Sequence, residues 1–219
     1  MKTYEGFIHL LKISSLKNST EFKYIKAFLF KNFCKKVSKI PSLNTERLLL
    51  RPFEIKDAKR VQLLAGDEAI ANGAINLPYP YIEGIAESWI VSHEIEFIKG
   101  SSLILAITLK EPALLIGSIG LYIYSKHQHA ELGYWIGKDY WGNGYCSEAV
   151  AEIIKYAFEK LSLNKIYAHY LCRNQASGKV LLKNGFSKEG FFRQHVKYNN
   201  VFEDIECFSL LSMDYMKMK

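Results

Sequence analysis

Residues 140–150 read Tyr-Trp-Gly-Asn-Gly-Tyr-Cys-Ser-Glu-Ala-Val, and they join two segments with different hydrophobic periodicity. The preceding residues 130–136 form an apolar and aromatic run that is typical of a strand. The following apolar residues have helical spacing, at Val150, Ile153, Ile154, Ala157, Phe158 and Leu161. We therefore expect a tight strand-to-helix turn around Gly142 and Gly144.

Such a turn is suited to binding an anion. Its backbone N–H groups point to one place, and the helix dipole adds positive potential there. A side chain at position 142 or 144 would block a phosphate or would require a positive φ angle. The turn therefore predicts a pyrophosphate site, and the alternative is a glycine turn without a ligand. Its spacing fits neither GxxxxGK followed by Ser or Thr nor GxGxxG, which disfavours the common nucleotide-binding folds.

The composition is that of a soluble domain. The 219 residues are 49% hydrophobic and 23% charged, which is enough for one domain with a sizeable core. No apolar run approaches the roughly 18 residues that a membrane span requires. The four cysteines are scattered without CxxC spacing, at Cys34, Cys146, Cys172 and Cys207. This usage predicts a cytoplasmic protein with reduced thiols, and it argues against a disulfide framework or a zinc site.

The net charge of +7 is carried by the first 40 residues, which hold nine lysines and two glutamates. The remaining chain has 20 basic and 20 acidic residues, so we expect no nucleic-acid surface on the domain. We expect residues 1–41 to form a basic amphipathic leader, with apolar positions at Phe22, Ile25, Leu29, Phe33, Val37 and Ile40. The leader could contact an anionic membrane surface weakly, pack on the domain, or be a poorly ordered extension.

Residues 42–219 are predicted to form one mixed α/β domain. The patterns indicate strands at 47–53, 103–108, 114–123, 130–136, 165–171, 186–193 and 202–211. They indicate helices at 57–65, 82–98, 146–161 and 174–184. Strands two to four follow one another directly, which suggests an antiparallel meander.

This order of elements resembles the GNAT acetyltransferases over roughly residues 42–219. The nearest resemblance is to the branch with the ribosomal-protein N-terminal alanine and serine acetyltransferases and the spermidine acetyltransferases. It rests on residues 45–53 (TERLLLRPF), 131–136 (ELGYWI) and 141–149 (WGNGYCSEA), and on Asn174 and Ser177 before Gly185-Phe186. The resemblance implies an α/β fold with a GNAT-like mixed, largely antiparallel sheet of roughly six to seven strands flanked by helices.

The resemblance also implies acetyl-CoA as cosubstrate, without a metal. An extended pantetheine arm can hydrogen-bond a strand edge as an added strand would. By resemblance this edge is formed by Tyr134, Trp135 and Ile136. The pyrophosphate would meet the backbone of Gly142, Asn143, Gly144, Tyr145, Cys146 and Ser147. Asn174 would hold the pantetheine from the neighbouring helix.

Three positions depart from the general family pattern, and one of them is Cys146, which stands where Gly or Ala is usual. Trp141 stands where many members have Gln or Arg, although Trp is common in the N-terminal acetyltransferase branch. Leu181 stands where many members carry a Tyr that protonates the leaving thiolate. Ser177 is therefore the candidate acid, with a water molecule as the alternative.

Acetyl transfer requires a neutral, aligned amine and stabilisation of the carbonyl oxygen. An α-amine has a pKa of ~7.7–8.0, against ~10.4 for a lysine, so an N-terminal acceptor needs only a weak base. Glu131 is the candidate base. The alternative for Glu131 is a structural carboxylate that pairs with a nearby Lys or His.

The acceptor is expected to be a protein N-terminus or a small amine such as a polyamine. Tyr79, Tyr81 and Trp89 could line its site, or could be core aromatics. The alternative function is a non-catalytic acyl-CoA-binding sensor, and the chain could be a monomer or a homodimer. Cys146 could be a nucleophile activated at a helix N-terminus, but no His-Asp spacing supports this.

The sequence also raises two further functions, metal binding and nucleic-acid binding. His127 and His129 lack a third metal ligand, so a metal site is disfavoured. Binding of nucleic acid through the basic leader is a further alternative.

We predict that the leader is dispensable for catalysis, because the chain after Pro41 has all the family landmarks and a balanced charge. A protein that starts at Ser42 should keep the melting temperature and acetyl-CoA turnover of the full chain. It should lose any binding of the full chain to anionic vesicles, measured by co-sedimentation. Loss of solubility or activity on truncation would instead mean that the leader packs on the domain.

Overall fold

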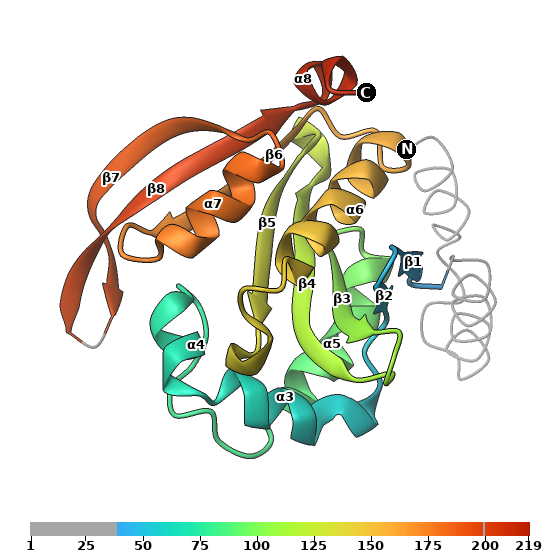
Figure 1. The fold of residues 1–219 in the computed structure, drawn as a ribbon, viewed down its shortest axis with the longest axis vertical. Coiled ribbons are helices and arrows are strands. Elements are labelled where there is room, and N and C mark those ends of the chain that lie inside the picture. Colours follow the sequence, from blue (N-terminus) through green and yellow to red (C-terminus); the bar gives the residue numbers. More distant parts are fainter. Residues whose placement is uncertain (1–38, 199) are drawn as a thin grey trace, which may run out of the picture. The chain divides into compact units, whose positions relative to one another are not determined.

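The computed structural model describes residues 39–198 and 200–219, so residues 1–38 of the predicted leader lie outside the described residues. The described chain forms an eight-stranded sheet with helices on both faces (Figure 1). The strands are β1 (Leu43–Asn44), β2 (Leu48–Arg51), β3 (Ser102–Leu109), β4 (Leu115–Tyr124), β5 (His129–Ile136), β6 (Lys165–Leu171), β7 (Ser187–Tyr198) and β8 (Val201–Leu211). Their spatial order is β1-β2-β3-β4-β5-β6-β8-β7.

The predicted mixed, largely antiparallel sheet is confirmed, with the meander at β3–β5. β5 and β6 are the parallel neighbours. The sheet has eight strands rather than six to seven, because the two-residue β1 pairs with β2 through Leu43 and Leu50. A two-residue strand leaves no periodic pattern, so the sequence could not indicate it.

The helices are α3 (Ala58–Ala65), α4 (Glu68–Gly73), α5 (Ile85–Ile98), α6 (Tyr145–Glu159), α7 (Gln175–Lys183) and α8 (Ser212–Lys217). Short 3-10 turns occupy Ile55–Asp57, Ser125–His127 and Lys138–Tyr140. The sequence did not indicate α4 or α8, and α5 begins three residues later than expected. α4 depends on a local cap, in which the Asp67 carboxylate accepts from the backbone N–H of Ala69 at 2.7 Å. Within the described residues, no helix is long and apolar enough to cross a membrane.

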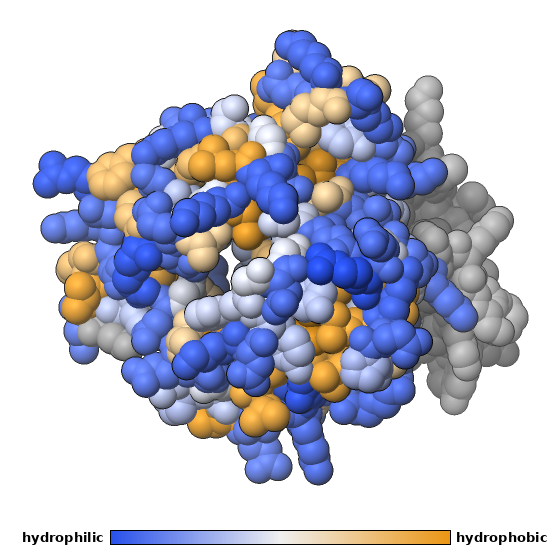
Figure 2. Space-filling model, viewed as in Figure 1, coloured by the Kyte–Doolittle hydropathy of each residue, from blue (hydrophilic) through white to orange (hydrophobic). Residues whose placement is uncertain are grey.

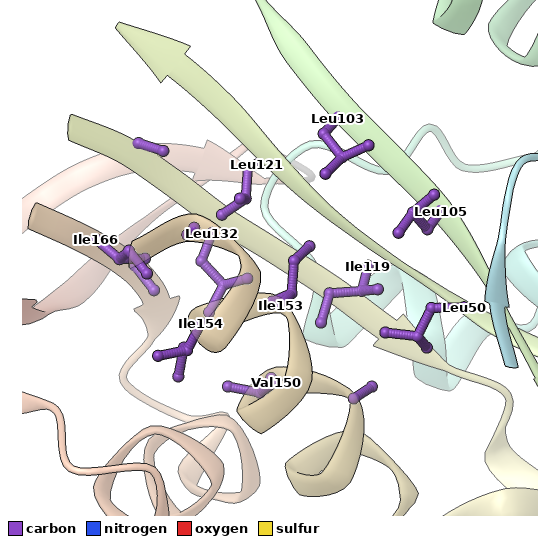
Figure 3. Close-up of a cluster of buried hydrophobic side chains, with 14 of the residues drawn as sticks. Leu50, Leu103, Leu105, Ile119, Leu121, Leu132, Val150, Ile153, Ile154 and Ile166 are labelled. Atoms are coloured by element: carbon purple, nitrogen blue, oxygen red, sulfur yellow. The ribbon is translucent and has the colours of Figure 1, made fainter. Parts of the chain in front are cut away.

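Apolar side chains cover both faces of the central strands. On one face, α6 lays Val150, Ile153 and Ile154 against the sheet (Figure 3). On the other, α3 and α5 pack against Ala106 and Leu115. Burial on both faces explains why β3 is an almost continuous apolar run rather than an alternating one.

β5 and β6 separate soon after they meet. They pair at three positions, with Glu131 and Tyr167 as the last pair. β5 continues beside β4 as far as Ile136, while β6 pairs along its whole length with β8. The sheet therefore opens into a wedge between β5 and β6 (Figure 1).

β7 and β8 form the long hairpin that ends the sheet. The pairing of β7 with β8 is interrupted by register shifts between Lys188 and Gly190 and between Phe192 and Val196. Most side chains of β7 are exposed, on both faces of the strand. This hairpin is longer than the predicted strands 186–193 and 202–211, which miss the twisted part after Arg193.

We predict that His93 makes the fold sensitive to acid. Its ring is buried on α5 between Phe53 and Trp89, with ring centroids 5.4 Å and 4.4 Å away, and neither ring nitrogen has a hydrogen-bond partner. Burial lowers its pKa from 6.5 to about 4. Below pH 6.5 the unfolded chain gains a proton that the folded chain does not bind, so stability falls as the pH decreases towards 4.

The expected loss between pH 7 and pH 4 is about 3 kcal/mol from this group. Urea unfolding of the protein should show that the His93→Leu substitution removes this part of the pH dependence of stability. His127→Leu, at an exposed position, should keep it. An identical pH dependence in the His93 variant and the unsubstituted protein would contradict the prediction.

Candidate functional site

The glycine loop between β5 and α6 depends on left-handed backbone. Gly142 and Gly144 have φ angles of 77° and 79°, and Gly144 is the residue that caps the N-terminus of α6. A Cβ atom added at Gly142 would meet no heavy atom within 4 Å. The space above Gly142 is therefore open, and the left-handed backbone is what requires glycine here.

Glu148, in the first turn of α6, holds the start of the helix next to the glycine loop through hydrogen bonds. Its carboxylate accepts from the Thr45 hydroxyl at 2.5 Å, from the Arg47 backbone N–H at 2.8 Å and from Arg47 Nε at 2.7 Å. Burial acts to raise the Glu148 pKa, but the hydrogen bonds from Thr45 and Arg47 outweigh it and lower the pKa. Arg47 Nη1 also donates to the Asn143 carbonyl oxygen at 3.0 Å.

Arg47 is a residue of the site that sequence reasoning missed. Its Nη2 lies 3.6 Å from the place that a Cβ of Gly144 would take, so it brings positive charge to the loop. The sequence analysis used Arg47 only as part of a motif. Its contact with residues about 100 positions away follows from the pairing of β2 in the sheet, which no local pattern indicates.

The predicted strand edge is open where the wedge begins. Tyr134, Trp135 and Ile136 pair with β4 on one side and lie beyond the last β5–β6 pair on the other. Trp141 Nε1 donates to the Ile136 carbonyl oxygen at 2.7 Å, which ties the glycine loop to the end of this edge. The geometry suits an extended chain of amides that runs from the strand edge to the loop.

A cavity of about 1050 Å³ occupies the wedge. Figure 2 shows the surface hollowed at this place, between α7 and α4. Eleven of the twelve predicted site residues line it: Glu131, Tyr134, Trp135, Ile136, Gly142, Gly144, Tyr145, Cys146, Ser147, Asn174 and Ser177. Asn143 is not among the lining residues, and its side chain donates instead to the carbonyl oxygens of Tyr140 and Trp141.

Asn174 and Ser177 begin α7 on the far side of the cavity. The Asn174 side chain accepts from the Ser177 backbone N–H at 3.2 Å and donates to the Gly73 carbonyl oxygen at 2.8 Å, which ties α7 to α4. The Ser177 hydroxyl lies 2.9 Å from the Tyr134 hydroxyl. Burial raises the pKa of Tyr134 far above its ordinary value, so this hydroxyl keeps its proton.

Glu131 occupies the point where β5 and β6 separate. Its Oε1 lies 3.4 Å from Nδ1 of His169, which is two residues beyond the last residue of β6 that pairs with β5. Tyr122 and Tyr167 have pKa values raised by burial and by the negative charge of Glu131. The sequence analysis missed His169 because only the strand register brings it to Glu131.

Cys146 does not fit the role of a nucleophile. Burial raises the pKa of its thiol to about 12, so the helix N-terminus does not produce a thiolate there. His127 and His129 stack with ring centroids 5.8 Å apart. No cluster of three or more potential metal ligands occurs within the described residues.

Of the three aromatic residues predicted for the acceptor side, two line the cavity and one does not. Tyr81 and Trp89 line the cavity, and Trp89 also packs edge-on against Phe53 and His93. Tyr79 is 45% exposed and is not among the cavity-lining residues. We therefore keep Tyr81 and Trp89 as candidates for the acceptor side.

Comparisons with known proteins agree with this geometry. A family model described as an acetyltransferase (GNAT) domain matches residues 47–187. An uncharacterized N-acetyltransferase of Bacillus subtilis, YoaA, is 31% identical over 78% of this chain and 97% of its own length. The ribosomal protein uS5-alanine N-acetyltransferase of Escherichia coli is 31% identical over 38% of this chain and 43% of its own length. A solved structure of a probable acetyltransferase is 26% identical, with a TM-score of 0.72 over 80% of this chain and 99% of that one.

We predict that Gly144→Val raises the Kd for acetyl-CoA at least ~100-fold, because a branched side chain would displace both the left-handed backbone and the pyrophosphate. Gly84→Val is the matched control. Gly84 also caps a long helix in the left-handed conformation, with φ 88° and no atom within 4 Å of an added Cβ, but it does not line the cavity.

Both variants should lose similar stability, since they carry the same backbone strain. Isothermal titration calorimetry should show weak binding for the Gly144 variant alone. Unchanged affinity in a folded Gly144 variant would mean that the pyrophosphate binds elsewhere.

Proposed function

This chain belongs to the GNAT acetyltransferase family, and from that premise we propose that it acetylates the α-amine at the N-terminus of a protein or peptide. The coarser assignment is an N-acetyltransferase that uses acetyl-CoA. The observation that carries the finer one is the charge of the cavity. Among its described lining residues, Glu131 is the one carboxylate, Lys179 is positively charged, and Arg173 is paired with Glu203 outside the lining.

The glycine loop and the strand edge support acetyl-CoA as the cosubstrate. Both line the same cavity, and the Trp141 indole connects them. An extended pantetheine arm fits the free edge beyond Glu131, and its pyrophosphate fits the loop with Arg47 alongside. This arrangement would bring the thioester to the part of the cavity between Glu131 and Ser177.

The electrostatics of the acceptor side favour an α-amine over a polyamine. A polyamine carries several ammonium groups at neutral pH and is recognised best by several carboxylates. An N-terminal α-amine carries at most one charge, and with a pKa of ~7.7–8.0 it is partly neutral near pH 7.5. One carboxylate beside an open cavity matches that acceptor. The E. coli relative is named for an alanine of ribosomal protein uS5 as its acceptor.

In this proposal, the carboxylate of Glu131 promotes loss of the amine proton as the amine attacks the thioester carbonyl carbon. Ser177 donates a hydrogen bond to the leaving sulfur from the N-terminus of α7. The Tyr134 hydroxyl at 2.9 Å holds the Ser177 side chain in position. The neutral Cys146 thiol supports direct transfer rather than an acyl-enzyme.

A substrate panel tests the proposal. Peptides with a free N-terminal Ala or Ser should be acetylated at the α-amine, as mapped by mass spectrometry. N-terminally blocked peptides with an internal Lys should be inactive. Spermidine should have a kcat/KM at least ~10-fold lower than that of the free peptides, because the amines of lysine and spermidine are protonated at neutral pH. A higher kcat/KM for spermidine than for every peptide would overturn the N-terminal assignment.

A further inference from the structure

Two groups from diverging strands meet at the mouth of the wedge. Glu131 is the last residue of β5 that pairs with β6, and His169 lies two residues further along β6. Their side chains approach to 3.4 Å between Oε1 and Nδ1, and both line the cavity. Their side chains are 34% and 24% exposed, so the pair is sheltered but can be reached by a ligand.

Apart from Glu131, the side chains around the His169 imidazole hold the ring in place without forming an ion pair with it. The ring meets Tyr167 edge-on at 5.3 Å and Phe192 of β7 at 6.5 Å. His169 also pairs in register with Cys207 of β8, whose thiol stays neutral because burial raises its pKa. The other titratable groups on this face are Tyr122 and Tyr124 of β4, His129 of β5, Tyr167 of β6 and His195 of β7, while Lys165 is paired with Glu189. Glu131 is thus the charged group in contact with the ring.

This contact gives the two ring nitrogens different roles. A carboxylate beside Nδ1 favours the tautomer with the proton on Nδ1, which leaves Nε2 as an acceptor. Among the described residues, Nε2 of His169 has no hydrogen-bond partner. A neutral imidazole is well suited to act as a general base, because one ring nitrogen accepts a proton while the other donates to the group that orients the ring.

We propose that His169 is the group that accepts the amine proton, and that Glu131 acts as the positioning residue that holds its tautomer. The inference rests on the proposed N-terminal acetylation. In the step, the amine nitrogen forms a bond to the thioester carbonyl carbon, and its proton passes to Nε2. The C–S bond then breaks while the Ser177 hydroxyl donates a hydrogen bond to the sulfur, and the thiolate takes its proton from solvent. The imidazolium returns its proton to solvent through the open mouth of the cavity.

The test uses the full chain with acetyl-CoA and a peptide that starts with Ala. His169→Asn should lower kcat/KM at pH 7 by ~100-fold or more, and the deficit should shrink above pH 9, where the free amine is abundant. The Kd for acetyl-CoA should stay within about twofold, because the pair lies outside the glycine loop. His127→Asn is the control, since His127 is exposed and does not line the cavity.

A double-mutant cycle separates a coupled pair from two independent residues. Glu131→Gln should reduce kcat/KM in the same pH-dependent manner, and the double variant should be little worse than His169→Asn alone. Nitrogen NMR should show the Nδ1-protonated tautomer of His169 in the unsubstituted protein and its loss in Glu131→Gln. A loss in His169→Asn that is equal at pH 7 and pH 9, or additive effects in the cycle, would overturn the inference.

The two proposals fail differently. If the unsubstituted protein acetylates spermidine but no peptide, the N-terminal assignment fails, and the same cycle is then run with spermidine. If peptides are acetylated and His169→Asn keeps the full rate and pH profile, the role of His169 fails while the N-terminal assignment stands.

Discussion

The short pairing of β5 with β6 is the constraint on which the site depends. Only three residue pairs join these parallel strands, and the sheet is divided beyond them. A parallel connection requires a crossover, and here α6 supplies it. The N-terminus of α6 therefore lies at the end of the same strand whose edge is free. The glycine loop at the start of α6, the open edge and the Glu131–His169 contact all follow from this one topological arrangement.

Much of the fold could be predicted from local patterns. The glycine turn, the meander and the amphipathic α6 are specified by nearby residues, because alternating or helical periodicity reports directly which face is buried. α4 and β1 could not be found in this way, since they are too short for a period and depend on the Asp67 cap and on pairing with β2. Of the site, the loop and Ser177 were visible as motifs, whereas Arg47 and His169 depend on strand register.

The polar groups that surround the site are largely engaged in hydrogen bonds within the protein. The Glu148 carboxylate accepts hydrogen bonds from Thr45 and Arg47. The Asn174 side-chain oxygen caps α7, and its side-chain nitrogen donates to Gly73 of α4. Such contacts hold the loop and α7 before any ligand binds, which reduces the ordering that binding must supply. The partly buried Cys146 and Tyr134 keep their protons, because desolvation raises both pKa values. The transfer chemistry is therefore left to the few groups at the wedge.

The twisted edge of the β7–β8 hairpin has a consequence for how the protein behaves in concentrated solution. β7 has unpaired backbone groups along its outer side, and Phe191 and Phe192 are 48% and 43% exposed on it. A flat strand with these features would offer a template for cross-β aggregation. The two register shifts bend this edge, and Arg193 and Lys197 place like charges along it, whereas Lys188 is paired with Glu206. An incoming strand would meet both a mismatched ladder and electrostatic repulsion, so the exposed aromatics can be carried without a general loss of solubility.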